Sequence, residues 1–193
     1  MGLQNDLRSR EDIVAALTIA EHDVAAFFTS LTSEELASRV GAAWTASEQL
    51  AHLNIAVGAV AKGFAAPKLL LRLRFGRSRR PGLSYVELRD TYRARLAAGG
   101  RASAEFTPPA IDVAASSIET RRNDLLERWR RRNGRLRGAV SSWSEKQLDT
   151  IQIPHPLIGS ISAREMLYFT IYHSEHHIAA TKQRLPRFAS DVS

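Results

Sequence analysis

Apolar residues recur at intervals of three and four positions along most of the chain, which predicts α-helices almost throughout. A first helix is predicted to begin after Ser9, and a long helix to occupy the second half of the chain. The apolar positions of the first helix are Ile13, Leu17, Ala20, Val24, Phe27, Phe28 and Leu31. Those of the long helix are Ile118, Leu125, Trp129, Leu136 and Val140.

Helix starts are marked by a hydroxyl residue followed three positions later by glutamate, a capping box in which both side chains satisfy free backbone amides. This pattern occurs at Thr45, Ser84 and Ser162. It predicts a second helix that ends at about Ala65, a shorter helical piece that ends at Ala98, and a last helix that ends at about Gln183. A short helical turn is predicted near Glu145, inside the connection formed by residues 143–156.

Four principal helices with three connections predict an all-α fold, a four-helix bundle of mostly antiparallel helices. Extra short helices are expected in the connection between the second and third helices. The length of 193 residues suits one domain. We expect a single helical-bundle domain over residues 1–193, with a core at about 10–185 and an irregular, basic insertion at 66–110.

The composition narrows the class of protein. Because the chain has no cysteine, disulfides, thiolate metal sites and a cysteine nucleophile are excluded. The N-terminal residues are polar and no apolar run reaches the length of a membrane span, so no membrane span and a cytoplasmic location are expected. The net charge of +7 favours anionic partners, and most of the excess is arginine in segments 72–80 and 121–137.

Histidines supply the candidate chemistry. His173 and His177 stand four residues apart, so they lie about 40° apart on a helical wheel, on its apolar side. His52 lies on a side of the second helix where the neighbouring residues are small (Ala56, Ala59 and Gly63), which leaves space beside it. Three imidazoles so placed favour zinc, nickel, copper or iron over calcium or magnesium. Hydrogen-bonded core histidines remain an equally good interpretation of the spacing alone.

Nearby residues have different expected roles. His176 points to the border of the polar face and is the weaker ligand candidate, while His22 lies opposite the apolar stripe and is expected to be solvated. Glu48, one turn before His52, is a candidate partner that orients this ligand.

Three segments resemble the DinB-like superfamily of metal-binding four-helix bundles. Segment 44–53 reads WTASEQLAHL, segment 155–169 reads HPLIGSISAREMLYF, and segment 172–177 reads YHSEHH. They resemble the family patterns W-x-x-x-E-x-L-x-H-L, H-P-x-x-G-x-x-x-x-x-E-x-L-x-F and Y-H-x-x-H-H in the same order. The resemblance extends from the first helix to the last and is weakest in the arginine-rich middle.

The resemblance implies a metal ion, usually zinc or nickel, held by His52, His173 and His177, and frequent homodimers. It also implies an enzyme of thiol transfer or isomerisation that uses a low-molecular-weight thiol such as bacillithiol, mycothiol or glutathione. In this hypothesis the metal lowers the pKa of a bound thiol or water for attack on a small-molecule substrate. Arg72, Arg74 and Arg77 are candidates to hold carboxylates of the thiol.

Catalytic residues other than the metal ligands are not identified by the sequence. Glu48, His155 and Tyr172 are candidates for a general base, but Glu48 already has a role as a helix cap and His155 precedes a proline that favours a turn.

Other functions stay open. The alternatives are a metal-dependent hydrolase, a metal-binding protein without catalysis, and a nucleic-acid-binding protein that uses the arginines of segment 121–137. Nucleic acid is not favoured, since those arginines lie on several faces of one helix without a known binding motif. A membrane-surface role for segment 68–80 is a further alternative, although its leucines are expected to pack against the bundle or a second subunit.

Overall fold

A computed structural model describes residues 7–110 and 115–188 of the chain. The polar N-terminal residues 1–6, on which the expected cytoplasmic location partly rested, lie outside these ranges. The fold is all-α apart from one small hairpin, as predicted.

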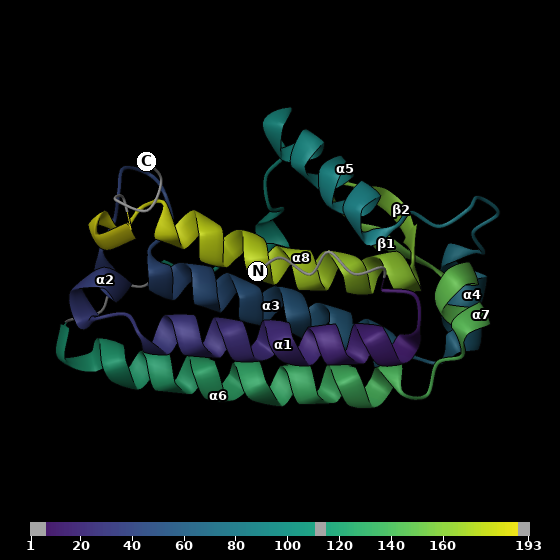
Figure 1. The fold of residues 1–193 in the computed structure, drawn as a ribbon, viewed down its shortest axis with the longest axis horizontal. Helices are drawn as coiled ribbons and strands as arrows, with labels where there is room; N and C mark the ends of the chain where they lie inside the picture. Colours follow the sequence, from purple (N-terminus) through teal and green to yellow (C-terminus); the bar gives the residue numbers. More distant parts are fainter. Residues whose placement is uncertain (1–6, 111–114, 189–193) are drawn as a thin grey trace.

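Four long helices form the bundle (Figure 1). Each of α1 and α3 packs against both α6 and α8, so α1 and α3 lie on one diagonal of the bundle and α6 and α8 on the other. The four helices are α1 (Arg10–Thr29), α3 (Ala46–Ala65), α6 (Ala115–Val140) and α8 (Ala163–Lys182).

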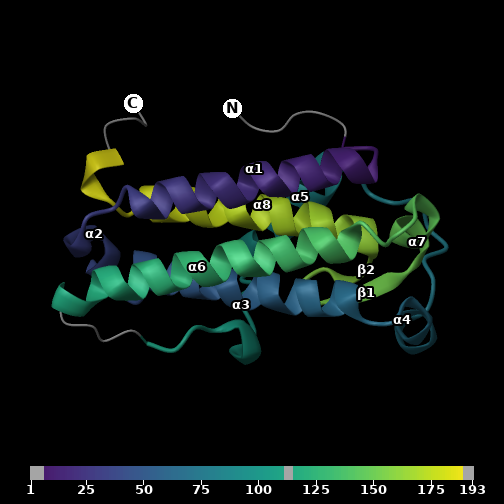
Figure 2. The same cartoon turned by 90° about the horizontal axis from the view of Figure 1, so that it is seen from below.

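The prediction of mostly antiparallel helices is wrong for half of the neighbouring pairs. Figures 1 and 2 show that α3 and α6 run in one direction and α1 and α8 in the other, so α3 packs parallel to α6 and α1 packs parallel to α8. The reason is the long connection from 66 to 114, which returns the chain to the end of the bundle at which α3 begins. A short connection would have forced α6 to run antiparallel to α3.

Short helices and one hairpin lie in the connections between the long helices. The predicted short helices in the long connection are present as α4 (Lys68–Phe75), α5 (Tyr85–Ala97) and the 3₁₀ turn η1 (Ala104–Phe106), and the predicted turn near Glu145 is α7 (Glu145–Thr150). The short helix α2 (Ser33–Ala37) and an antiparallel hairpin of β1 (Gln152–His155) and β2 (Gly159–Ser162) were not predicted. Four-residue strands are too short to show an alternating pattern.

The predicted capping boxes are present at Thr45, Ser84 and Ser162, and Ser9 caps α1 in the same way. Every apolar position predicted for α1 and α6 is buried. The two largest buried side chains also satisfy their polar atoms, because the Trp129 indole N–H donates to the Glu21 carbonyl and that of Trp143 donates to the Phe64 carbonyl. These bonds join α6 to α1 and the α6–α7 connection to α3.

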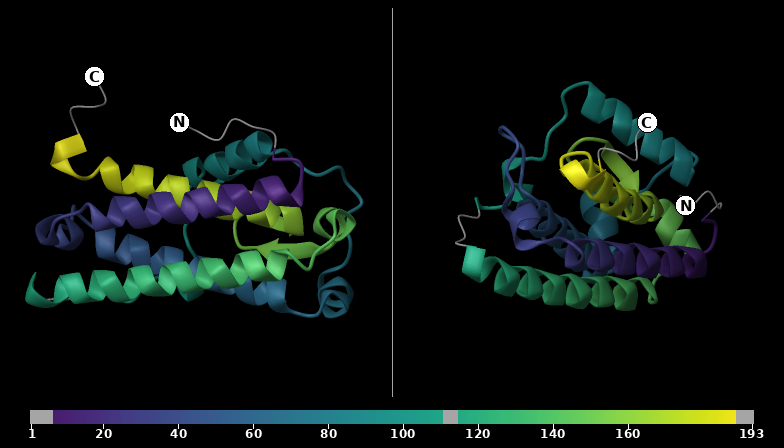
Figure 3. Two further views of the ribbon diagram at one scale, coloured as in Figure 1. Left: turned by 60° about the horizontal axis from the view of Figure 1, so that its bottom comes forward. Right: turned by 60° about the vertical axis from the view of Figure 1, so that its left-hand side comes forward.

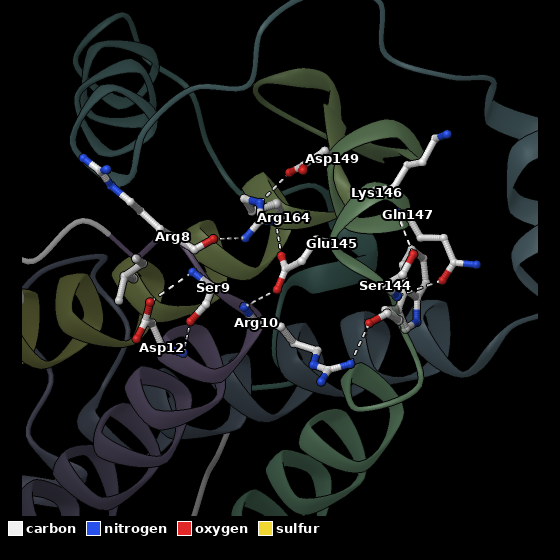
Figure 4. A network of polar contacts seen from close by, with 12 residues as sticks. Arg8, Ser9, Arg10, Asp12, Ser144, Glu145, Lys146, Gln147, Asp149 and Arg164 are labelled. Carbon is white, nitrogen blue, oxygen red and sulfur yellow. Dashed lines mark hydrogen bonds and ion pairs between the residues drawn. The ribbon is translucent and has the colours of Figure 1, made fainter.

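A cluster of polar side chains joins the N-terminus of α1 to α7 and α8 (Figure 4). The Arg164 guanidinium donates to the carboxylates of Asp149 and Glu145 and to the Arg8 carbonyl. Glu145 also accepts a hydrogen bond from the backbone N–H of Arg10. Three segments that meet at one end of the bundle are therefore held by a single side chain.

The long connection is attached to α8 by a buried carboxylate. Arg80 donates two hydrogen bonds to Glu165, at 2.7 and 2.9 Å, and the backbone N–H of Leu83 donates a third at 2.8 Å. Tyr85, at the start of α5, donates to the Glu175 carboxylate. As a result α5 lies across α8 on the outside of the bundle (Figure 3).

The arginines of α6 are partly used inside the fold. Arg137 pairs with Glu21, Arg132 donates to the Asn54 carbonyl, and Arg122 donates to the Leu31 carbonyl. These three arginines therefore join α6 to other segments of the fold.

Helix α4 only partly follows the expectation for its leucines. Leu71 is buried against the core, whereas Leu69, Leu70 and Leu73 are exposed. Among the described residues, no single helix is both long and apolar enough to cross a membrane; α3 and α4 pass such a criterion only together, with a bend of 105° between them.

Candidate metal centre

Three buried histidines meet between α3 and α8. His52 lies in the second turn of α3, and His173 and His177 lie on successive turns of α8. The two helices pack directly against each other. The i, i+4 spacing therefore presents both α8 imidazoles to the one from α3, as the helical wheel predicts.

The Nε2 atoms of the three rings converge. His173 Nε2 lies 3.1 Å from His52 Nε2 and 3.0 Å from His177 Nε2. Two nitrogens on one tetrahedral zinc ion, each about 2.0–2.1 Å from it, are roughly 3.3 Å apart. Within the described residues, this trio is the group of histidine, aspartate and glutamate side chains whose ligand atoms lie close enough together to hold a metal ion.

Hydrogen bonds at Nδ1 fix the tautomers of two of the rings. His52 Nδ1 lies 2.7 Å from the Phe106 carbonyl, which can only accept, and His177 Nδ1 is bonded to the side-chain oxygen of Gln49. Both Nδ1 atoms therefore carry hydrogen, and both Nε2 atoms present lone pairs. His173 Nε2 can donate to only one of these two, so a cation at the point of convergence satisfies the three rings better than any proton arrangement.

Burial keeps the imidazoles neutral. It lowers the pKa of His52, and it lowers the pKa values of His173 and His177 well below their usual range, with a further decrease from the neighbouring histidines. A neutral imidazole is the form that ligates a metal.

His176, on α8, and His22, on α1, lie outside the converging group. The His176 ring centroid lies 5.2 Å from that of His177, but His176 is not part of the converging group, in agreement with the wheel. His22 is solvent-exposed and contacts Asp23, also as expected.

The orienting partners differ from the prediction. Glu48, expected to assist His52, instead caps α3 through Thr45 and pairs with Arg39. Its neighbour Gln49 and the carbonyl of Phe106 hold the two rings. The sequence contains a signal for Gln49, because a glutamine on a helix that is apolar almost all round needs a buried partner. It contains none for a backbone carbonyl 54 positions away.

A cavity of about 150 Å³ adjoins the histidines, and its walls are mainly apolar. His52 and His173 lie at its edge, and the small residues predicted to leave space beside His52 do line it. The long connection, predicted as an irregular insertion, supplies a second wall with Tyr92 of α5 and Phe106 of η1. The hairpin and α8 contribute the others, chiefly Ile153, His155, Leu157, Met166 and Phe169.

The candidate catalytic and cofactor-binding residues differ in their distance from the cavity. Of the three possible general bases only His155 lines the cavity. Arg72, Arg74 and Arg77 do not line it; they lie on or just after α4, exposed to solvent. The arginine that does border the cavity is Arg101, which no local feature of the sequence distinguishes from the other arginines.

The comparisons with known proteins agree with this architecture. Residues 16–180, which include all four long helices apart from their ends, match the sequence model of the DinB superfamily. No curated protein and no solved structure gives a significant match.

Proposed function

The chain belongs to the DinB superfamily, and we propose that it is a metal-dependent enzyme whose ion is held by His52, His173 and His177. Zinc or nickel suits three neutral imidazoles with no thiolate and no carboxylate among them. The reaction we propose is transfer of a low-molecular-weight thiol to a small substrate, or an isomerisation that uses such a thiol.

One observation carries this proposal. The lone pairs of His52 and His177 are both directed at His173 Nε2, with Nδ1 hydrogen bonds that leave no other tautomer. A core cluster stabilised by hydrogen bonds alone would pair donors with acceptors. Here acceptors converge, and an apolar cavity opens beside them.

A divalent ion bound to these nitrogens supplies Lewis-acid chemistry, because it lowers the pKa of a thiol or water that binds it. The chain's own residues prepare the site. Phe106 and Gln49 hold the ligand rings in place, which reduces the reorganisation needed on binding. The apolar walls formed by Val60, Phe64 and Phe169 exclude water from the space next to the rings.

Hydrolysis is the second candidate reaction, since the same site can bind water in place of a thiol. The apolar cavity favours transfer, because a hydrolase needs water at the reacting atom whereas a thiol transferase benefits from its exclusion. We also propose that the enzyme is a homodimer, as the resemblance to the family implies, and that it acts in the cytoplasm.

Elemental analysis tests the metal site. Purified protein is expected to hold about one zinc or nickel ion per chain, and the His52→Ala, His173→Ala double variant is expected to hold none. His176→Ala is the matched control, since it removes a neighbouring, half-buried imidazole of the same helix. Equal metal in wild type and the double variant would refute the proposal.

Activity is tested with the metal-loaded protein. Glutathione, mycothiol and bacillithiol are each supplied with 1-chloro-2,4-dinitrobenzene, and conjugate formation that requires both metal and His52 supports transfer. Release of nitrophenol from p-nitrophenyl acetate without a thiol would favour the hydrolase.

A further inference from the structure

His155, at the end of β1, has a tautomer fixed by its own turn. Its Nδ1 accepts hydrogen bonds from the backbone N–H groups of Leu157 and Ile158, both at 3.1 Å. An imidazole nitrogen that accepts is unprotonated, so in the neutral ring the hydrogen resides on Nε2. His155 is therefore a hydrogen-bond donor at Nε2.

The ring stays neutral and its donor is unused within the fold. His155 is buried, and burial lowers its pKa to about 4. Its faces and edges pack against Phe169, at 4.2 Å between ring centroids, and Tyr92, at 6.0 Å. Throughout the described residues no acceptor is bonded to Nε2, although His155 lines the cavity beside the metal centre. A donor in an apolar wall normally has a partner.

The Phe169 ring packs against both His155 and the candidate metal ligand His173. Its ring centroid lies 4.8 Å from that of His173 and 4.2 Å from that of His155. A small molecule in the cavity can thus lie on the apolar wall with one end at the metal ligands and another at His155.

Arg101 brings a positive charge to the same wall. It is the charged side chain among the described residues that line the cavity. The preceding residue, Gly100, approaches Leu157 so closely that a Cβ there would lie 3.3 Å from Cδ2 of that leucine. Because the N–H of Leu157 is bonded to His155, the Arg101 segment packs on the turn that fixes the His155 tautomer.

We propose that the cavity binds a small apolar monocarboxylate, with His155 Nε2–H donating to a carboxylate oxygen and Arg101 balancing its charge. This assigns the substrate class of the proposed enzyme and rests on that function. The walls are apolar, so the body of the ligand is apolar. An anion transferred into such walls needs both a donor and a counter-charge, and one arginine matches one carboxylate.

Calorimetry with 3-phenylpropanoate and its neutral amide tests the ligand class. Wild-type protein is expected to bind the acid at least about tenfold more tightly than the amide, the size of effect that hydrogen bonds to charged groups produce. Arg101→Gln is expected to remove this preference. Equal binding of acid and amide by the wild type would overturn the proposal.

Three variants of His155 separate its binding role from its role in the turn. His155→Asn keeps an oxygen where Nδ1 accepts and loses the Nε2 donor, so it should fold with wild-type stability and bind the acid about tenfold less tightly. His155→Gln keeps a donor near the Nε2 position, so it should bind better than His155→Asn. His155→Ala removes both groups and should lose stability as well. Wild-type affinity in His155→Asn would refute the role of Nε2.

Two measurements distinguish failure of this inference from failure of the proposed metal enzyme. In the wild type, the ¹⁵N resonance of Nε2–H of His155 should shift when 3-phenylpropanoate binds, and an unchanged resonance would contradict the contact. The His52→Ala, His173→Ala variant should still prefer the acid to the amide. Loss of that preference would show that the carboxylate binds the metal instead, and would overturn the proposal while supporting the metal centre.

Discussion

The backbone carbonyl of Phe106 lies 2.7 Å from Nδ1 of His52, although 54 positions separate the two residues. The contact links the 3₁₀ turn η1, which lies in the long connection, to a candidate metal ligand on α3. The connection also supplies cavity walls through Tyr92 and Phe106. A segment that reads as an irregular insertion in the sequence is thus part of the candidate site.

Replacement of Gln49 is expected to weaken metal binding without loss of the fold. Gln49→Leu removes the acceptor for Nδ1 of His177, and loss of such an orienting partner costs about 10–100-fold in metal affinity. Gln49→Glu keeps an acceptor and adds charge, so it should bind metal at least as tightly as the wild type. Competition with a chromophoric chelator measures both. Gln183→Leu, at the exposed glutamine that caps the C-terminus of α8, is the control. Equal affinities in all four proteins would contradict the role of Gln49.

Glu165 is expected to make the folded state less stable at low pH. Burial raises the pKa of its carboxyl, but hydrogen bonds from Arg80 and from the backbone N–H groups of Leu83 and Ser162 outweigh this, and the pKa is lowered from its ordinary 4.5. The carboxyl thus binds its proton less readily in the folded chain than in the unfolded one. The stability that the ionised Glu165 contributes to the folded state is fully present above pH 4.5. It is lost as the pH falls through the lower pKa of the folded state.

Urea denaturation over a pH series measures this effect. Glu165→Gln should lower the free energy of unfolding at pH 7 by about 2 kcal/mol, less than a fully buried pair would cost, because Arg80 is partly exposed. The variant should also show a shallower decrease than the wild type below pH 4.5. Glu127→Gln, in an exposed pair with Arg131, is the control. If the free energy of unfolding of wild type and of Glu165→Gln decreased equally steeply below pH 4.5, groups other than Glu165 would cause the decrease.

Arg164 should matter more to stability than its place near the surface indicates. Arg164→Met removes hydrogen bonds to Asp149, Glu145 and the Arg8 carbonyl (Figure 4), and we expect it to reduce the free energy of unfolding by about 1–3 kcal/mol. Arg131→Met breaks one exposed pair within a helix and should cost less than about 0.5 kcal/mol. Urea denaturation measures both variants. Similar losses of unfolding free energy would show that the hydrogen bonds of Arg164 do not hold these segments together.

Two glycines of α3 should respond differently to alanine. A Cβ at Gly63 meets nothing within 4 Å, so Gly63→Ala should stabilise the helix, by about 0.5–1 kcal/mol. A Cβ at Gly58 would lie 3.2 Å from Nε of Arg132, which is held by the Asn54 carbonyl, so Gly58→Ala should give no gain. Thermal unfolding compares the two. A larger gain at Gly58 would mean that Arg132 moves freely.

Larger residues at Gly63 test the cavity. Gly63→Leu places a bulky side chain in the wall of the cavity that His52 also lines and should abolish binding of 3-phenylpropanoate. Metal content should stay as in the wild type, because Gly63 contributes no ligand atom. Retained binding of the acid would show that the ligand occupies another place.

Local features of the sequence were sufficient for the helices and for the choice of histidines. Capping boxes depend on residues three positions apart, so Thr45, Ser84 and Ser162 marked true helix starts. The choice of His173 and His177 over His176 depends on one turn of one helix. The parallel packing of α3 on α6 depends on contacts of longer range and was predicted wrongly. The β-hairpin is local, but its strands are too short to show an alternating pattern, and it was missed.

By itself, then, the sequence determined which faces of each helix are apolar and which imidazoles share a face, because those relationships are set by helix geometry over a few residues. Only the tertiary structure decided which groups these faces and imidazoles contact. The partner of His177 depends on how α3 packs against α8. The partner of His52, the Arg101 border of the cavity and the free donor of His155 depend on how the long connection and the hairpin pack on the bundle. Contacts between such distant segments depend on the packing of the whole chain, which no local pattern encodes.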